Sequence, residues 1–165
     1  MIVEIQDWLF EIDREATRIY TQENLEDHCT CGYCRNYYLT IDSVYPALRL
    51  FLEQFGANPE APVDFLPVEP TLCIVSYAVS GRILRRGPKP LDLDGRLLFV
   101  QTQSQLDYEL KCPQPYFVFT TDHLDLPWVL DEDMDEVISP ANEPECLERM
   151  WRKLLNDAEA TPMQS

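Results

Sequence analysis

The segment 37–55 constrains the fold more than any other part of the sequence, because its apolar residues recur every three or four positions. That spacing places them on one face of a helix and predicts a buried helical surface. Pro46 interrupts the pattern, since proline lacks the backbone N–H that a helix interior requires. We therefore expect two helices, over about 33–42 and 44–55, with Ser43 capping the second one.

Another helical pattern lies near the start of the chain, and most of the predicted strands lie after residue 70. A strand is expected over about 8–12, and Asp13 is expected to cap a helix over 14–26. Gly56 suits the left-handed end of the second of the paired helices, and the proline-rich segment 57–70 is expected to be an extended linker. Runs of β-branched and aromatic residues then predict strands over 72–79, 82–86, 96–102 and 115–121.

The C-terminal part of the chain is expected to return to the same core. Segment 127–130 is apolar, and a final amphipathic helix is predicted over about 144–156, while residues 158–165 are expected to form a frayed tail. The length of 165 residues suits one domain. We predict a single α+β domain over residues 1–157, with a mainly antiparallel sheet packed by helices from the first third and by the C-terminal helix.

The composition is strongly acidic and limits the partners of the protein. There are 13 Lys+Arg against 29 Asp+Glu, which gives a net charge of −16. An acidic surface repels phosphate groups, so we expect no binding to nucleic acid and none to anionic membranes. It attracts a basic protein through complementary potential, as an immunity protein, an inhibitor or a DNA mimic does. A short basic strip is interpreted as a solvated strand edge rather than an anion site, and comprises Arg82, Arg85, Arg86 and Lys89.

The N-terminal segment lacks the features of a signal peptide, and we expect a cytoplasmic location. Glu4, Asp7 and Glu11 interrupt the apolar region that such a peptide needs. The longest charge-free stretch, 70–81, is shorter than the ~18 residues that span a bilayer. In the cytoplasm, the six cysteines are expected to be reduced thiols, metal ligands or redox groups rather than disulfides.

One short segment concentrates the side chains that can carry chemistry: His28, Cys29, Cys31 and Cys34. The last two cysteines have the spacing of a metal knuckle, in which a tight turn lets both sulfurs face one ion. Cys29 is expected to supply a third ligand, and His28 or a distant side chain the fourth. The distant candidates are Cys112, Cys146 and His123. This spacing predicts a soft-ligand metal site, with zinc as the expected ion.

Two other interpretations of this segment stay open. Residues 31–35, Cys-Gly-Tyr-Cys-Arg, resemble the active-site run of the thioredoxin superfamily, which implies dithiol–disulfide chemistry. That family places the run directly after a buried apolar strand, whereas the polar and acidic segment 23–28 precedes it here. In the structural interpretation, the thiols pack as small buried hydrophobic groups beside Tyr33, Tyr37 and Tyr38. Cys73, within an apolar run, is expected in the core.

Two further groups of polar residues favour structural explanations. The acidic segment 131–136 has carboxylates at alternate positions, but it lacks the glycine that a calcium loop needs at its sixth position. His123 lies between Asp122 and Asp125, and a surface histidine is a better interpretation than a general base.

A wider set of segments resembles small uncharacterised bacterial proteins: Cys-Thr-Cys-Gly-Tyr-Cys-Arg-Asn-Tyr at 29–37, Phe-Leu-Glu-Gln-Phe-Gly at 51–56 and Leu-Pro-Trp-Val-Leu at 126–130. The resemblance implies a bacterial origin and no assigned activity. The leading hypothesis is a non-enzymatic, acidic protein-binding module of the immunity or inhibitor type, with a structural zinc clip. The alternative is a metal- or thiol-dependent enzyme centred on Cys29, Cys31 and Cys34.

Overall fold

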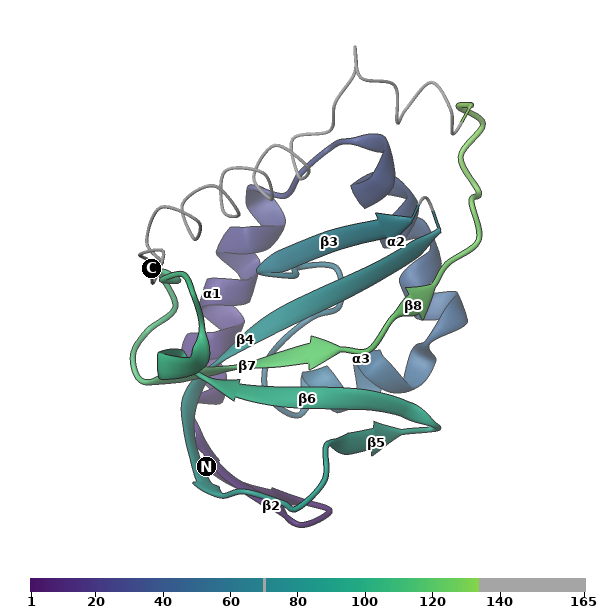
Figure 1. The fold of residues 1–165 in the computed structure, drawn as a ribbon. Coiled ribbons are helices and arrows are strands. Elements are labelled where there is room, and N and C mark those ends of the chain that lie inside the picture. The colour runs from purple at the N-terminus through teal and green to yellow at the C-terminus, as the bar shows by residue number, and fades with distance from the viewer. Residues whose placement is uncertain (70, 134–165) are drawn as a thin grey trace, which may run out of the picture.

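A curled sheet of antiparallel strands forms the body of the protein, and helices cover one of its faces. The structure is a computed structural model that describes residues 1–69 and 71–133. Within them it contains three α-helices: α1 (Arg14–Glu26), α2 (Gly32–Val44) and α3 (Pro46–Glu53). Figure 1 shows these helices behind the sheet. The predicted α+β class with a mainly antiparallel sheet is therefore confirmed.

Eight strands form the sheet, in the order β1-β2-β4-β7-β6-β5, and both β3 and β8 also pair with β4. Each strand is antiparallel to its neighbour. In chain order the strands are β1 (Ile2–Ile5), β2 (Trp8–Ile12), β3 (Asp64–Glu69), β4 (Leu72–Arg85), β5 (Leu91–Leu93), β6 (Arg96–Thr102), β7 (Tyr116–Thr121) and β8 (Leu124–Asp125). The predicted strands over 8–12, 96–102 and 115–121 are confirmed within a residue.

The segments 72–79 and 82–86 are strand as predicted, to within a residue, but they form the single strand β4 rather than two separate strands. Gly81 lies between the two predicted segments, and its backbone stays paired with Ile12 of β2. A Cβ at Gly81 would lie 2.3 Å from the carbonyl oxygen of Glu11. The glycine thus allows two backbones to approach closely while the strand continues.

The predicted linker over 57–70 contains β3, so that part of the prediction is wrong. Pro67 lies inside this strand, which pairs with β4, and the register shifts between Pro67 and Glu69. Proline is tolerated on an edge strand, because the missing N–H faces away from the partner strand or coincides with an irregularity. The prolines therefore do not exclude a strand here.

The hairpin of β1 and β2 is joined to β5 by side chains. The side-chain amide of Gln6 donates to the carbonyl of Asp92 at 2.9 Å and accepts from its N–H at 3.2 Å. The indole N–H of Trp8 donates to the carbonyl of Lys89 at 2.8 Å. These contacts bring the two ends of the main strand order together and curl the sheet.

The helix boundaries follow from proline and from capping. Asp13 accepts a hydrogen bond from the N–H of Ala16 at 2.9 Å, as predicted for the cap of α1. Proline at the first position of α3 explains why α2 and α3 are separate helices. Tyr45 rather than Ser43 precedes that helix, and the Ser43 hydroxyl instead donates to the carbonyl of Thr40 within α2.

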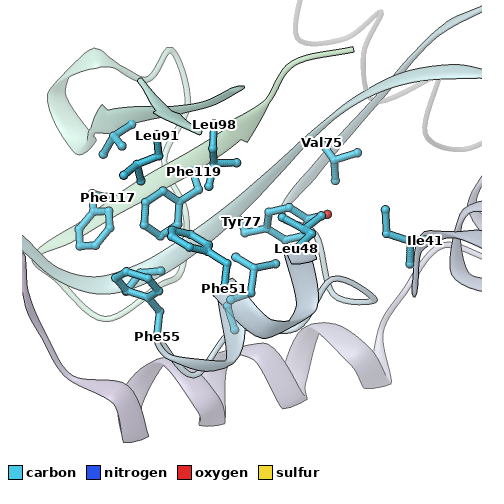
Figure 2. Close-up of a cluster of buried hydrophobic side chains, with 14 of the residues drawn as sticks. Ile41, Leu48, Phe51, Phe55, Val75, Tyr77, Leu91, Leu98, Phe117 and Phe119 are labelled. Atoms are coloured by element: carbon cyan, nitrogen blue, oxygen red, sulfur yellow. The ribbon is translucent and has the colours of Figure 1, made fainter. Parts of the chain in front are cut away.

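An aromatic cluster fills the space between α3 and the sheet, as Figure 2 shows. The rings of Phe55 and Phe119 lie 4.9 Å apart, and those of Phe10 and Phe117 lie 5.0 Å apart. Both pairs are almost fully buried, and burial of such surface dominates the stability of the fold. The apolar spacing over 37–55 thus supplies the helical half of this core.

Other predictions are met or lie beyond the described residues. Gly56 adopts the left-handed conformation, with φ of 83°. The predicted helix over 144–156, Cys146 and the tail over 158–165 lie outside the described residues. Among the helices that are described, none has the length and apolar character of a membrane span.

Candidate metal centre

Three thiols meet where α2 begins. The sulfur atoms of Cys29, Cys31 and Cys34 all lie within 4.8 Å of one another, and we call these residues the thiol cluster. Cys31 caps the helix in an extended conformation, and its sulfur accepts a hydrogen bond from the N–H of Cys34 at 3.5 Å. The first turn of α2 therefore brings the sulfurs of Cys31 and Cys34 to one side, close enough to hold a metal ion.

The N-cap position of a helix favours the thiolate form of a cysteine that occupies it. The cap position usually holds Ser, Thr, Asp or Asn, whose oxygen accepts a backbone N–H. Here the sulfur of Cys31 takes that role. The positive end of the helix dipole and the backbone N–H both stabilise a thiolate, which is the form that binds soft metals.

The rest of the cluster lies among aromatic side chains. Cys29 and Cys34 are buried, and Cys31 is half-buried. The rings packed around them belong to Tyr33, Tyr38, Phe65 and Trp128. Burial raises the pKa of the Cys29 thiol and outweighs an opposing backbone hydrogen bond from Cys31. In the metal-free protein this raised pKa opposes use of Cys29 itself as a nucleophile.

Side chains of α2 hold the loop that carries Cys29. The guanidinium of Arg35 donates to the carbonyl of Thr30 at 2.9 Å. The hydroxyl of Tyr38 donates to the carbonyl of Cys29 at 3.1 Å. Burial, followed by the charges of the nearby thiols, raises the pKa of Tyr38, so its hydroxyl stays protonated and keeps donating. The loop is therefore fixed before any ligand binds.

A distant segment, residues 126–132, closes over the same helix, and we call it the strap. The side-chain amide of Asn36 donates to the carbonyl of Pro127 at 3.0 Å and accepts from the N–H of Val129 at 2.8 Å. Arg35 pairs with Glu132 through two contacts, of 2.6 and 2.7 Å. The return of segment 127–130 to the core thus takes place beside the thiol cluster.

Among the predicted fourth ligands, His28 lies nearest in the chain. It is exposed, its ring lies 4.8 Å from that of Tyr38, and its Nδ1 lies 2.7 Å from the carbonyl oxygen of Leu25. The group of mutually close ligand atoms comprises the three cysteines without His28. His28 does share a cavity of about 280 Å³ with Cys29 and Cys34.

The distant candidates for the fourth ligand have other surroundings. Cys112 belongs to a separate apolar cluster that includes Tyr20 and Tyr116. The Nδ1 of His123 lies 3.4 Å from a carboxylate oxygen of Asp122 at the surface, as expected for a surface histidine. Cys146 lies outside the described residues.

Tyr38 lies beside the thiols, as the structural interpretation predicted, whereas the supporting roles of Arg35 and Asn36 were not predicted. Tyr38 follows Cys34 by four positions, so helical spacing already places both on one face of α2. That signal was available in the sequence. The roles of Arg35 and Asn36 had no local signal, because their partners in the strap lie 91 to 97 positions away.

Comparisons of the chain with protein-family models, with curated proteins and with solved structures gave no match in any of the three. The geometry and the charge of the chain are therefore the basis of the functional argument.

Proposed function

We propose that this protein is a non-enzymatic, acidic protein-binding module whose thiol cluster, with His28, holds a structural zinc ion. The observation that carries the metal proposal is the convergence of three sulfurs within 4.8 Å at one helix start. Zinc in structural sites takes four sulfur or nitrogen ligands in a tetrahedron. Three neighbouring thiols supply most of that set.

His28 is the proposed fourth ligand because its surroundings suit the role. The distance of 2.7 Å from Nδ1 to the carbonyl oxygen of Leu25 fits an Nδ1–H that donates to this carbonyl. The lone pair of Nε2 is then free for a metal. His28 lines the same cavity as Cys29 and Cys34, and it directly precedes Cys29 in the chain.

A metal at this place would act as a clip. It would tie the loop of Cys29 to the first turn of α2, next to the contact between α2 and the strap. Each thiol must lose its proton to bind, and the free energy of binding is available to stabilise the folded state. Such a site stabilises the fold and performs no chemistry.

The test of the clip is elemental analysis of protein purified without added metal, combined with thiol titration. We expect about one zinc per chain and thiols that react only after a chelator is added. Three freely reactive thiols and no bound metal would remove the metal proposal. A matched Cys73→Ser variant keeps the cluster intact and should keep the metal.

The partner proposal rests on the net charge of −16. A protein of this charge captures a basic partner by electrostatic steering, and salt screens that attraction. We expect association with a basic protein partner, such as the target of an immunity or inhibitor protein, to weaken steeply as salt is raised. Pull-downs at low and at high salt concentration test this. Equal recovery of the partner at both concentrations would contradict the proposal. A cytoplasmic location stays a prediction that accompanies this proposal.

The alternative is a metal- or thiol-dependent enzyme centred on the thiol cluster, and the cavity beside Cys29 and Cys34 favours it. The same samples test this alternative. Metal-free protein is mixed with a small disulfide substrate. If the substrate is reduced and the thiol cluster is oxidised by an equal amount, the result supports an enzyme rather than a structural clip.

A further inference from the structure

We propose that a second cavity, separate from the thiol cluster, binds a small carboxylic acid with a short apolar tail. The carboxylate of this ligand would pair with the guanidinium of Arg96. The cavity lies between the junction of α2 and α3 and the hairpin of β5 and β6. This proposal concerns neither the metal nor the basic partner, and it stands if both of those proposals fail.

The walls of this cavity suit an apolar group. Its volume is about 230 Å³. Most of its lining is hydrocarbon, from Val44, Tyr45, Leu48, Leu93, Leu98 and Leu124. Such a cavity, with few polar groups in its wall, is the common form of a small-molecule site. The tail of the ligand would displace water from apolar surface on binding.

Arg96 is the cation in the wall, and its environment leaves it ready for an anion. Its guanidinium lies 5.1 Å from the ring of Tyr45 and donates to the carbonyl of His123 at 3.2 Å. Within residues 1–69 and 71–133 it forms no ion pair with a carboxylate. Other arginines of this acidic chain do, namely Arg18, Arg35, Arg49, Arg82 and Arg85.

The geometry of the guanidinium defines the headgroup of the ligand. Arginine has five N–H donors, and the contact with His123 uses one of them. The stacking on Tyr45 holds the group in place, so little side-chain freedom is lost when an anion binds. A planar carboxylate matches two parallel N–H donors of this fork.

The volume limits the size of the tail. Water takes about 30 Å³ per molecule in the liquid, so the cavity has room for about eight non-hydrogen atoms. Hexanoate has about this size. Longer fatty acids would have to leave part of the chain in water.

Asp94 also lines the cavity and limits the charge of the ligand. Its carboxylate repels an anion and favours one with a single negative charge. Asp94 has a φ of 52° in the turn between β5 and β6, a conformation that asparagine also accepts. Asp94→Asn therefore removes the charge without straining the turn.

The experiment is calorimetric titration of the protein, as purified, with hexanoate and with hexan-1-ol. We expect saturable binding of hexanoate at one site, about tenfold weaker in Arg96→Met, and about threefold tighter in Asp94→Asn. Arg82→Met is the matched control, because it removes the same charge from an exposed arginine that pairs with Glu11, and it should leave binding unchanged.

Three results would overturn the proposal: no saturation by hexanoate, equal weakening by Arg82→Met and Arg96→Met, or hexan-1-ol binding as tightly as hexanoate. Circular dichroism shows whether each variant is folded. If Arg96→Met fails to fold, the Asp94→Asn variant decides, since unchanged or weaker binding there contradicts a site for an anion.

Discussion

The cysteines of this protein divide between two environments. Cys73 in β4 and Cys112 are buried singly among apolar side chains, and burial alone raises the pKa of each thiol to about 12. The cysteines of the thiol cluster are also shielded, but each lies beside two other sulfurs. Burial makes a lone thiol an inert part of the core, whereas convergence of several thiols produces a ligand set.

The backbone explains this difference. Strand β4 contains one cysteine, Cys73, and an extended strand spreads its residues along its length, so no second thiol of that strand lies beside it. The turn that starts α2 folds three nearby positions toward one point, and the Cys31 cap fixes that turn. The same residue type is thus structural in one place and a candidate ligand in the other.

The largest expected effect is the loss of the metal when one member of the thiol cluster is changed. Cys34→Ser should reduce bound zinc from about one per chain to a small fraction, because a hydroxyl is a poor zinc ligand. Elemental analysis after gel filtration measures this. Cys112→Ser is the control and should keep its zinc. Equal loss of zinc in both variants would contradict the distinction between lone thiols and the thiol cluster.

Alkylation should separate the two groups of thiols next most clearly. In metal-free folded protein at pH 8, iodoacetamide is expected to label half-buried Cys31 before Cys73 and Cys112. Added zinc should protect the thiol cluster and leave the two lone thiols unchanged. Peptide mass spectrometry reports each site. Labelling of Cys31 at the same rate with and without zinc would argue against a metal at that site.

Truncating a lone thiol should cost stability without touching the metal. Cys73→Ala is expected to lower the free energy of unfolding by about 1–2 kcal/mol at neutral pH, through lost packing, while zinc binding stays intact. Urea unfolding measures it. A loss of zinc in this variant would mean that the two environments are coupled.

The free energies of unfolding of wild type and Cys73→Ala should also differ in their pH dependence. The pKa of Cys73 is raised on folding, so its stabilising effect is present below the unfolded pKa of about 9 and is lost as pH rises toward the folded pKa of about 12. The stability difference between wild type and Cys73→Ala should therefore shrink over this range. A constant difference would contradict the buried, neutral thiol.

The smallest expected effect concerns the pair that ties the strap to α2. Arg35 lowers the pKa of Glu132, so the pair stabilises the folded state above the ordinary pKa of a glutamate and loses that effect as acid protonates Glu132. Fluorescence of Trp128, which lies in the strap, should change at a higher pH in Arg35→Ala than in wild type. Identical acid titrations would show that this pair does not hold the strap.

Local patterns predicted much of the fold. Pro46 within an apolar helical spacing indicated two consecutive helices, and Asp13 before a helical pattern indicated a cap. The errors arose where one residue type has two roles. Proline can end a strand or lie at its edge, as Pro67 does, and glycine can break a strand or allow close approach, as Gly81 does.

One missed element did have a local signal. The short strand β5 precedes Asp94 and Gly95, and both residues have positive φ, of 52° and 87°. Asp-Gly between two apolar runs is a strong indicator of a tight hairpin. The hairpin was therefore predictable, whereas the side-chain link from Gln6 to Asp92, 86 positions away, was not.

The candidate site shows the same limit. Cysteine spacing predicted which thiols come together, because Cys29, Cys31 and Cys34 lie within six consecutive residues. It did not predict that Asn36 and Arg35 bind the strap, since those contacts depend on the whole sheet. Local spacing therefore identifies the candidate ligands, and only the fold shows what a metal there would stabilise.

X-ray absorption at the zinc edge tests the central claim most directly, on protein purified without added metal. If the thiol cluster and His28 form the site, the spectrum will show three sulfurs at about 2.3 Å and one nitrogen at about 2.0–2.1 Å. A bound zinc surrounded only by oxygen and nitrogen, or protein that holds no zinc at all, would contradict it.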